Sequence, residues 1–505
     1  MKHRIIQAIG LIFIIGIVAF VLINWSTTLF YIIGVSFQLL SLVISFRLLF
    51  IDKRGTNSKV AWILIVFILP ILGIIFYFLF GRNPETRKFS VAQITESKKI
   101  IKVMHDLSGA NLDAAPKLSL KQANLTGIAP LKGNKLQILT NGEIAFKDIL
   151  TYLKKATNHI HMQYYIFKTD EISTEIRDVL IDKAKSGVEV RFMYDGFGSH
   201  ALHPDFLAPL KEAGAEIYAF DPILSPWIVR TANLRNHRKI IVIDGQTGYT
   251  GGLNVGEEYR SNTDDFEFWR DTHMRIQGLA VRELQEAFLK DWVYLKNEMN
   301  AADEFISPEG LEKYFSPEAQ GNDWAQVVYG GPYDEEYYVR DSMLNLMESA
   351  HESVWIISPY FVPDDESLAA IRRVALNGID VKIIIPGKGD RGISFNGSNA
   401  YIEEMIDAGA EMYAYDNKSF IHAKIMIVDG KEAAIGTANF DVRSFRLNHE
   451  LMVYLYENSS AVKHLVNDFK QDILDSRHFT KEDMLKKPIT QRLKETLSSL
   501  LSPIL

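Results

Sequence analysis

The chain has 505 residues, of which 47% are hydrophobic, so it is long enough to form two or three domains with sizeable cores. Its formal net charge of -7 argues against nucleic acid as a partner, because duplex binding usually needs a basic surface. The sequence contains no cysteine, which excludes disulfide bonds and thiolate metal sites.

The first part of the chain contains three uncharged apolar stretches, at residues 5–23, 29–46 and 60–80. Each has about 20 residues, the length of helix that crosses the hydrocarbon core of a bilayer. A cleaved signal peptide is an alternative for the first stretch, but no small-residue cleavage site follows it. We therefore expect residues 1–81 to form a membrane anchor of two or three apolar segments in an integral protein of the cell membrane.

Positive charges around these stretches bear on their topology. They form three clusters: Lys2 and Arg4; Lys53, Arg54 and Lys59; Arg82, Arg87 and Lys88. Because cytoplasmic loops are enriched in Lys and Arg, all three clusters favour the cytoplasmic side. Two full crossings satisfy this pattern if the third segment is re-entrant and bends at Pro70. The expectation is a multi-pass protein whose remaining domains lie on the cytoplasmic face.

Residues 82–134 are expected to form a juxtamembrane linker. Basic and apolar side chains are interleaved over residues 82–102, which predicts a helix. This helix could lie at the surface of anionic lipid, or it could be a solvated linker helix. The sequence does not choose between the two.

An internal duplication follows. The segment "SGVEVRFMYDGFGS" (186–199) matches "NGIDVKIIIPGKGD" (377–390), and "LKEAGAEIYAFD" (210–221) matches "MIDAGAEMYAYD" (405–416). In each half, apolar strands alternate with helical patterns that end in Gly, which is typical of β-α-β units. The predicted fold class is α/β, with two similar lobes at residues 135–295 and 325–480.

The C-terminal residues 481–505 are predicted to form an amphipathic tail. Ile489, Leu493, Leu497 and Leu501 recur at helical spacing in this segment. The sequence leaves open whether this stripe packs on a lobe or lies on a membrane.

Each half also contains a strand in which three ionisable residues recur at one spacing. "NHRKIIVIDG" (236–245) and "IHAKIMIVDG" (421–430) begin 185 residues apart. Side chains alternate along a strand, so the histidine and the lysine of each copy project from the same face. The aspartate begins an Asp-Gly turn at the end of the strand. The six residues are His237, Lys239, Asp244, His422, Lys424 and Asp429.

A second strand after each turn leads to small residues and an asparagine. The two copies are "GGLN", which contains Gly252 and Asn254, and "GTAN", which contains Thr437 and Asn439. Small residues let the backbone approach a ligand closely, and the asparagine offers an amide donor beside the ammonium.

Imidazole, ammonium and amide groups together suit an anionic phosphodiester. Its displacement needs a nucleophile on one side of phosphorus and an acid on the other, which two histidines can supply. A single such copy is more often structural. A metal site is disfavoured because each lysine would repel a cation. We therefore expect a catalytic site with no metal and no cofactor.

The repeated pattern resembles the phospholipase D superfamily, and the whole chain is similar to the bacterial cardiolipin synthases within it. The similarity extends over "PILGIIFYFLFGR" (70–82), "FWRDTHMRIQG" (268–278) and "FIHAKIMIVDGKEAAIGTANFDVRSFRLNHE" (420–450). The resemblance implies two lobes, each a mostly parallel sheet flanked by helices, which share one active site. It also implies phosphatidyl transfer between two phosphatidylglycerol molecules, giving cardiolipin and glycerol through a phosphohistidine.

The resemblance implies roles for individual residues as well. His237 is expected to be the nucleophile and His422 the acid and base, with the reverse assignment left open. Asp244 and Asp429 complete the catalytic motif, although organising the turn and steadying the lysine is their more natural role. The expected substrate-binding residues are Lys239, Lys424, Asn254, Asn439, Thr437 and Gly252.

An acidic residue downstream of each histidine is expected to orient its ring. Glu450 lies 28 residues after His422, and Asp271 is the expected counterpart for His237. Asp265, at the same spacing of 28 residues from His237, is the alternative.

Two other functions remain compatible with the sequence. The same histidines could hydrolyse phospholipid or nucleic acid, with water as the acceptor. The protein could instead be a non-catalytic lipid-binding protein, although all six motif residues are present. The oligomeric state is not predicted.

Overall fold

The computed structural model describes residues 28–52, 56–81, 90–107, 113–222, 234–261, 263, 265–332, 334, 336–390, 392–457 and 459–500. The chain divides into an N-terminal unit, which ends at Asn83, and a second unit that contains both lobes. The apolar stretch at residues 5–23 lies outside the described residues, as does Leu501.

The N-terminal unit contains the helices α2 (Thr28–Phe50), α3 (Thr56–Ile68) and α4 (Pro70–Phe80). Within the described residues, one helix is long and apolar enough to cross a membrane, over Tyr31–Phe50. Large apolar side chains project outward from α2, among them Tyr31, Val43 and Phe50. Such a surface is unfavourable in water and suits a lipid environment.

The bend expected at Pro70 is confirmed. Leu69 separates α3 from α4, and Pro70 starts the second helix, where its missing N–H costs no hydrogen bond. The two helices fold back on each other, so the rings of Trp62 and Tyr77 lie 5.8 Å apart. Gly73 permits this approach, because a Cβ at that position would lie 2.3 Å from the carbonyl oxygen of Ile65.

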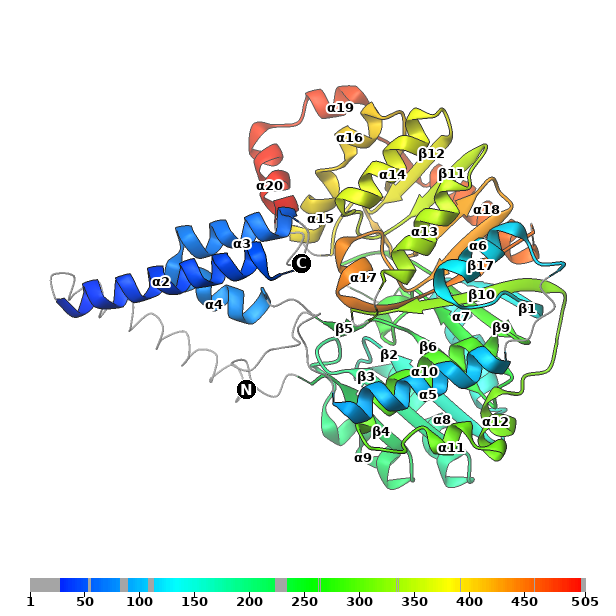
Figure 1. The fold of residues 1–505 in the computed structure, drawn as a ribbon. Helices are drawn as coiled ribbons and strands as arrows, with labels where there is room; N and C mark the ends of the chain where they lie inside the picture. The colour runs from blue at the N-terminus through cyan, green and yellow to red at the C-terminus, as the bar shows by residue number, and fades with distance from the viewer. Residues whose placement is uncertain are drawn as a thin grey trace. The chain divides into compact units, whose positions relative to one another are not determined.

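A single 16-stranded sheet runs through the second unit (Figure 1). The first lobe contributes β1 (Leu131–Thr140), β2 (His159–Tyr164), β3 (Glu189–Asp195), β4 (Glu216–Phe220), β6 (Ile240–Ile243), β7 (Thr247–Gly251) and β9 (Thr272–Gln277). The second lobe contributes β10 (Asp323–Gly330), β11 (Ser353–Ile357), β12 (Asp380–Ile385), β13 (Glu411–Tyr415), β15 (Ile425–Val428), β16 (Glu432–Gly436), β17 (Asn448–Leu455) and β18 (Ser476–His478).

The duplication is visible in the strand order. From the centre outward the first lobe reads β1-β9-β7-β6-β2-β3-β4, and the second reads β10-β17-β16-β15-β11-β12-β13-β18. β1 and β10 pair with each other and join the two halves. The lobes are mixed rather than mostly parallel as expected. The parallel pairs along this path are β2–β3 and β3–β4 in the first lobe and β11–β12 and β12–β13 in the second, while the other neighbours are antiparallel.

Helices cover both faces of this sheet. The first lobe contains α7 (Gly142–Leu153), α8 (Glu171–Lys185), α9 (Pro204–Glu212) and α10 (Val281–Lys296). The second contains α13 (Tyr338–Glu348), α14 (Asp365–Leu376), α15 (Gly392–Asn399), α16 (Ile402–Asp407), α17 (Val442–Arg446), α18 (Ser460–Leu474), α19 (Lys481–Leu485) and α20 (Ile489–Leu500).

Two of these helices tie the lobes together. α10 contacts β10 of the second lobe, and α18 contacts β1 of the first. Their buried side chains, among them Trp292 and Phe469, belong to one apolar core that includes strands of both lobes. Separate cores on the opposite face lie under α7 to α9 in the first lobe and under α13, α14 and α16 in the second. The shared core holds the two lobes in one fixed arrangement.

The helix predicted near residues 82–102 is α5 (Val91–Leu107), and it packs against α10. Ile100 is fully buried in the shared core, and the buried Glu96 carboxylate accepts the N–H of Ala302 at 2.9 Å. Lys99 adds an ion pair with Asp303 at 2.8 Å. These contacts make α5 part of the second unit rather than a solvated linker. The other linker helix, α6 (Lys117–Thr126), packs on α13.

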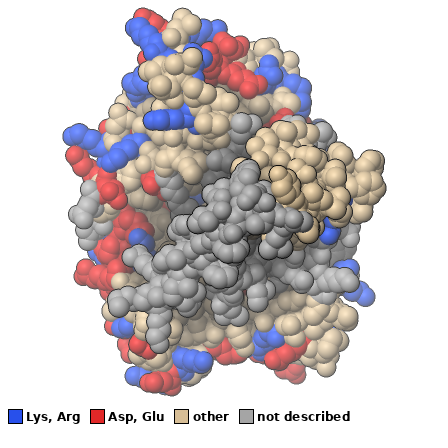
Figure 2. All heavy atoms as spheres, turned by 90° about the vertical axis from the view of Figure 1, so that its left-hand side faces the viewer, with Lys and Arg blue, Asp and Glu red and all other residues tan. Residues whose placement is uncertain are grey.

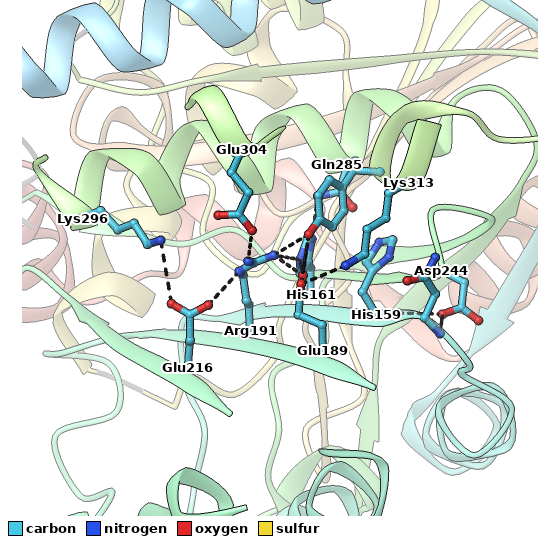
Figure 3. A network of polar contacts seen from close by, with 12 residues as sticks. His159, His161, Glu189, Arg191, Glu216, Asp244, Gln285, Lys296, Glu304 and Lys313 are labelled. Carbon is cyan, nitrogen blue, oxygen red and sulfur yellow. Dashed lines mark hydrogen bonds and ion pairs between the residues drawn. The ribbon is translucent and has the colours of Figure 1, made fainter. Parts of the chain in front are cut away.

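The connection between the lobes contains α11 (Asp303–Ile306) and α12 (Pro308–Phe315), and a buried polar network holds it in place (Figure 3). Arg191 on β3 is 3% exposed and pairs with Glu189, Glu216 and Glu304. The hydroxyl of Tyr314 donates to Glu189 at 2.8 Å. Because Glu304 and Tyr314 belong to the connection, its position is fixed by charge as well as by packing.

Candidate active site

The two histidine motifs meet because each lobe lends a short strand to the other. β5 (Arg235–Asn236) pairs with the start of β17, and β14 (Ser419–Ile421) pairs with β8 (Phe268–Arg270). The pairing continues into the histidines themselves. The N–H of His237 donates to the carbonyl of His449 at 3.0 Å, and that of His422 donates to Arg270 at 2.7 Å. Each histidine is therefore attached by its backbone to the opposite lobe.

This exchange sets which carboxylate each imidazole meets. Nδ1 of His237 lies 2.9 Å from Glu450, and Nδ1 of His422 lies 2.7 Å from Asp271. The expected orienting residues are therefore at the histidines, but their assignment within each half is wrong: each carboxylate contacts the histidine of the other lobe. Asp265 is exposed, with no such contact. A carboxylate on Nδ1–H leaves Nε2 as the free nitrogen of the ring.

The lysines lie beside the histidines, as strand alternation predicts. Lys239 and Lys424 are both buried, and each ammonium donates to the carbonyl of its own histidine, at 2.7 Å for Lys239. An ammonium has three donors, so two remain on each lysine. Burial lowers the pKa of Lys424 to about 8 and that of Lys239 well below its usual value. The positive charge of Lys424 lowers the pKa of Lys239 further. An anionic ligand would reverse these shifts.

Both histidines are neutral in the free site. Burial lowers the pKa of His237 to about 4, although the Glu450 carboxylate opposes the shift. Burial lowers the pKa of His422 to about 4 as well, against the opposing effect of Asp271. Burial by itself would raise the pKa of Glu450 and of Asp271, but the adjacent histidine, the nearby lysine and further hydrogen bonds together lower each pKa. The site therefore contains two neutral imidazoles, each held by a carboxylate.

The two asparagines are buried beside this group. Asn254 accepts the N–H of Ile166 at 3.1 Å and donates to the hydroxyl of Tyr259 at 2.8 Å. Asn439 donates to Asp441 at 3.2 Å. Each amide nitrogen has two hydrogens, so one donor on each asparagine remains for a ligand.

Thr437 and Gly252 each lie against one of the orienting carboxylates. The Thr437 hydroxyl donates to Glu450 at 2.5 Å and accepts the N–H of Leu451 at 2.9 Å, so it holds the Glu450 carboxylate in position. The lack of a side chain at Gly252 makes room for the Asp271 carboxylate, because a Cβ at position 252 would lie 2.0 Å from Oδ1 of Asp271. Both residues act on the orienting carboxylates, one by a hydrogen bond and the other by its small size.

Asp244 and Asp429 lie away from the histidines and lysines, at turns where their carboxylates bind backbone N–H groups. The carboxylate of Asp244 accepts the N–H groups of Thr157, Asn158 and His159, and Figure 3 shows it beside His159. Asp429 accepts the N–H groups of residues 351 to 353 in the same way. A four-residue strand, β6 or β15, separates each aspartate from its lysine, a distance of more than about 10 Å. They organise the turn that precedes a neighbouring strand and do not steady the lysine.

Aromatic rings and one further polar side chain surround the two histidines. The ring of Tyr165 packs edge-on against His237 at 4.8 Å, and those of Tyr259 and Trp269 lie 5.8 and 5.7 Å from His422. Asn448 donates to Glu450 at 3.0 Å. The position of Asn448 two residues before Glu450 on one strand was the available signal, since such residues share a face. The contacts of Tyr259 and Trp269 with His422 have no sequence signature.

Comparison with known proteins identifies families and a fold that agree with this site. The sequence pattern of the family described as "Cardiolipin synthase, PLD-like domain" matches residues 149–292 and 343–473, and that described as "Phospholipase_D-nuclease N-terminal" matches residues 39–82. Among solved structures, a phosphatidylserine synthase from Haemophilus influenzae has the same fold, with a TM-score of 0.59, 14% identity, and coverage of 77% of this chain and 100% of that chain.

Relatives of similar length are closer in sequence. Cardiolipin synthase 1 of Bacillus anthracis is 41% identical, over 100% of both chains. The major cardiolipin synthase ClsA of Bacillus subtilis (strain 168) is 39% identical, over 93% of this chain and 98% of that protein. With its duplicated lobes and its paired histidine motifs, the chain belongs to the cardiolipin synthase family of phospholipase D-like enzymes.

Proposed function

We propose that this enzyme transfers a phosphatidyl group from one phosphatidylglycerol to another, giving cardiolipin and glycerol. The observation that carries the proposal is the pair of crossed contacts, His237 with Glu450 and His422 with Asp271, beside two buried lysines. Two imidazoles with free Nε2 atoms suit attack and protonation on opposite sides of one phosphorus. The names of the full-length relatives support cardiolipin as the product.

The first half of the reaction would form a phosphatidyl-histidine. Nε2 of His237 attacks phosphorus, the bond from phosphorus to the headgroup glycerol breaks, and His422 donates its proton to the leaving oxygen. Because His422 is neutral in the free site, it takes up that proton when the anionic phosphodiester binds beside it. Lys239, Lys424 and the free amide donors stabilise the charge on the equatorial oxygens.

The second half would transfer the phosphatidyl group to a lipid alcohol. The headgroup hydroxyl of a second phosphatidylglycerol attacks phosphorus, His422 removes its proton, and the bond from phosphorus to His237 breaks. Both histidines are under one-tenth exposed, at 9% and 7%, and aromatic rings pack against them. Such a site limits the access of water, which favours transfer to an alcohol over hydrolysis.

The assignment of His237 as the nucleophile rests on its better-held carboxylate. Glu450 receives donors from both Thr437 and Asn448 in addition to His237. A carboxylate that is fixed in this way stabilises the imidazolium character that develops when Nε2 forms a bond to phosphorus. The pair formed by Asp271 and His422 lacks a side-chain hydroxyl, since Gly252 stands where the second lobe has Thr437.

The test is to incubate purified protein with phosphatidylglycerol in vesicles and separate the lipids. The proposal predicts a four-chain lipid and free glycerol in equal amounts. Phosphatidic acid as the main product would instead establish hydrolysis. His237→Ala and His422→Ala should each abolish turnover, whereas Asp265→Ala, a matched change at an exposed carboxylate, should retain it.

The roles of the two histidines can be separated by trapping. With radiolabelled phosphatidylglycerol, His422→Ala should accumulate labelled protein slowly, because attack by His237 is still possible, and His237→Ala should not. Label on His237→Ala and none on His422→Ala would reverse the assignment.

We propose further that the enzyme is a multi-pass membrane protein with its lobes on the cytoplasmic side. α3 and α4 have 13 and 11 residues, about 20 and 16 Å of helix, so neither spans a hydrocarbon core of about 30 Å. Their fold-back supports a re-entrant segment that enters and leaves on one side. The three clusters of Lys and Arg support the cytoplasm as that side.

Labelling of single cysteines would test this topology without background, because the chain has none of its own. Lys53→Cys and Lys88→Cys should both react only with a reagent that reaches the cytoplasmic face. Reaction of the two positions from opposite sides would show that the segment crosses the membrane.

A further inference from the structure

The C-terminal helix α20 is oriented with its apolar side outward. Ile489, Leu493 and Leu497 recur every four residues and therefore form one stripe, and they are 75%, 56% and 58% exposed. On the opposite side, Glu495 and Ser498 are 5% and 8% exposed. Surface helices normally bury their apolar face and expose their polar face, so this arrangement is the reverse of the usual one.

Polar contacts fix α20 in this orientation. Gln491 donates to Asn396 on α15 at 3.0 Å and to Glu495, and Glu495 also pairs with Lys487 at 2.9 Å. Arg492 pairs with Glu403 on α16 at 2.9 Å. Rotating the helix to bury its leucines would break these hydrogen bonds and ion pairs. The outward stripe is thus part of the folded second lobe.

The charge around the stripe restricts what can cover it. The one acidic residue of α20 is Glu495, which faces inward and is paired, so the outer face carries no carboxylate. Lys494 is exposed beside the leucines. The upper part of Figure 2, the side that carries α19 and α20 in Figure 1, shows uncharged surface with charged groups around it.

We propose that the outer face of α20 docks the second lobe on anionic lipid, with Ile489, Leu493 and Leu497 inserted at the level of the headgroups. An apolar stripe flanked by a cation and free of acidic groups has the chemistry of an interfacial helix. The N-terminal unit contains a helix that is long and apolar enough to cross a membrane, so we expect a bilayer to be available to the stripe. This contact would set the height of the lobes above the lipid surface and does not depend on the proposed reaction.

The test uses the full chain in vesicles that contain anionic lipid. An environment-sensitive fluorophore is attached at Leu493→Cys, and for comparison at Leu474→Cys, an equally apolar and 77% exposed position at the end of α18. In Figure 1, α18 lies on the other side of the second lobe from α20. We expect a quencher carried on lipid chains to reduce the signal several-fold more at position 493, and aqueous iodide to act more strongly at position 474.

Other results would overturn the proposal. Equal quenching by iodide at both positions would show that the stripe faces water. Protection at position 493 from both quenchers would show that protein covers it, and cross-linking between two Leu493→Cys copies would identify that protein as a second molecule. A thermal unfolding midpoint equal to that of the unlabelled chain would establish that the label has not displaced α20.

Discussion

At Thr437, a single hydroxyl forms two hydrogen bonds in a fully buried position. It donates to Glu450 at 2.5 Å and accepts from the backbone of Leu451 at 2.9 Å. Thr437→Val keeps the shape but removes one hydrogen bond from the Glu450 carboxylate and one from the backbone N–H of Leu451, at a cost of about 1–3 kcal/mol. If this loss falls on the transition state, kcat should fall about 5- to 150-fold. Thr437→Ser, which retains the hydroxyl, should remain within a few-fold of the wild type.

A pH profile distinguishes a positioning role for Thr437 from general destabilisation. The hydroxyl helps to keep the pKa of Glu450 below its usual value, after burial alone would have raised it. Without the hydroxyl, the carboxylate should take up a proton at a higher pH. The acid limb of kcat should therefore move upward in Thr437→Val. A uniform loss of activity at all pH values would contradict this role.

Gly252 provides the corresponding test in the first lobe. In Gly252→Ala the new Cβ would lie 2.0 Å from Oδ1 of Asp271, so the carboxylate must move away from His422. Turnover should fall by at least the amount seen for Thr437→Val, and the thermal midpoint should drop. In the double variant Gly252→Ala, Asp271→Ala the midpoint should recover while activity does not, because the clash is gone and the partner of His422 is missing. A normal midpoint in the single variant would show that the site can relax.

At the level of elements, the connection between the lobes depends on Arg191. This side chain is 3% exposed and holds Glu304 of α11 together with carboxylates of the first lobe. Removing one partner of a buried ion pair costs about 3–5 kcal/mol. Arg191→Met should therefore lower the free energy of unfolding by several kcal/mol, measured by denaturant titration. Lys313→Met, at a position 33% exposed in the same network, is the matched control and should cost much less.

The elements also show what sequence could and could not provide. The duplication, the two histidine strands and the break at Pro70 were predictable, because each leaves a local pattern. The exchange of β5 and β14 between lobes was not predictable. Strands of two and three residues carry too little pattern, and their partners lie 213 and 151 residues away along the chain. The error over which carboxylate serves which histidine follows directly from this exchange.

The remaining differences between the predictions and the structure result from tertiary packing. The interleaved charges near residues 82–102 were compatible with lipid, water or protein, and burial of Glu96 and Ile100 against α10 selects protein. The expected hydroxyl donor at Thr437 was real, but its partner is a carboxylate that only the folded structure brings within reach. The sequence could therefore predict which residue types the site needs, but it could not predict which residues contact each other in the folded protein.

At the level of the whole molecule, many titratable groups are buried, and burial is the largest cause of their pKa shifts. Burial lowers the pKa of five histidines to about 4: His161, His237, His273, His422 and His449. Carboxyls whose pKa is raised by burial oppose them, among them Glu286, whose pKa is about 7, and Asp441, whose pKa is about 6. Between pH 6.5 and 4 the unfolded chain therefore binds protons at more of these histidines than the folded chain does.

The sign of the pH dependence follows from this difference. A group whose pKa is lower in the folded state contributes stability that is present above the unfolded pKa and is lost as the pH falls towards the folded value. The thermal midpoint should accordingly decline as the pH is lowered from 6.5 to 4. His273 isolates one contribution, because its ring is fully buried and neither nitrogen has a hydrogen-bond partner. His273→Leu should remove about 3 kcal/mol of the acid-induced loss. Midpoint curves for wild type and variant that run parallel over this pH range would show that His273 does not titrate as its burial requires.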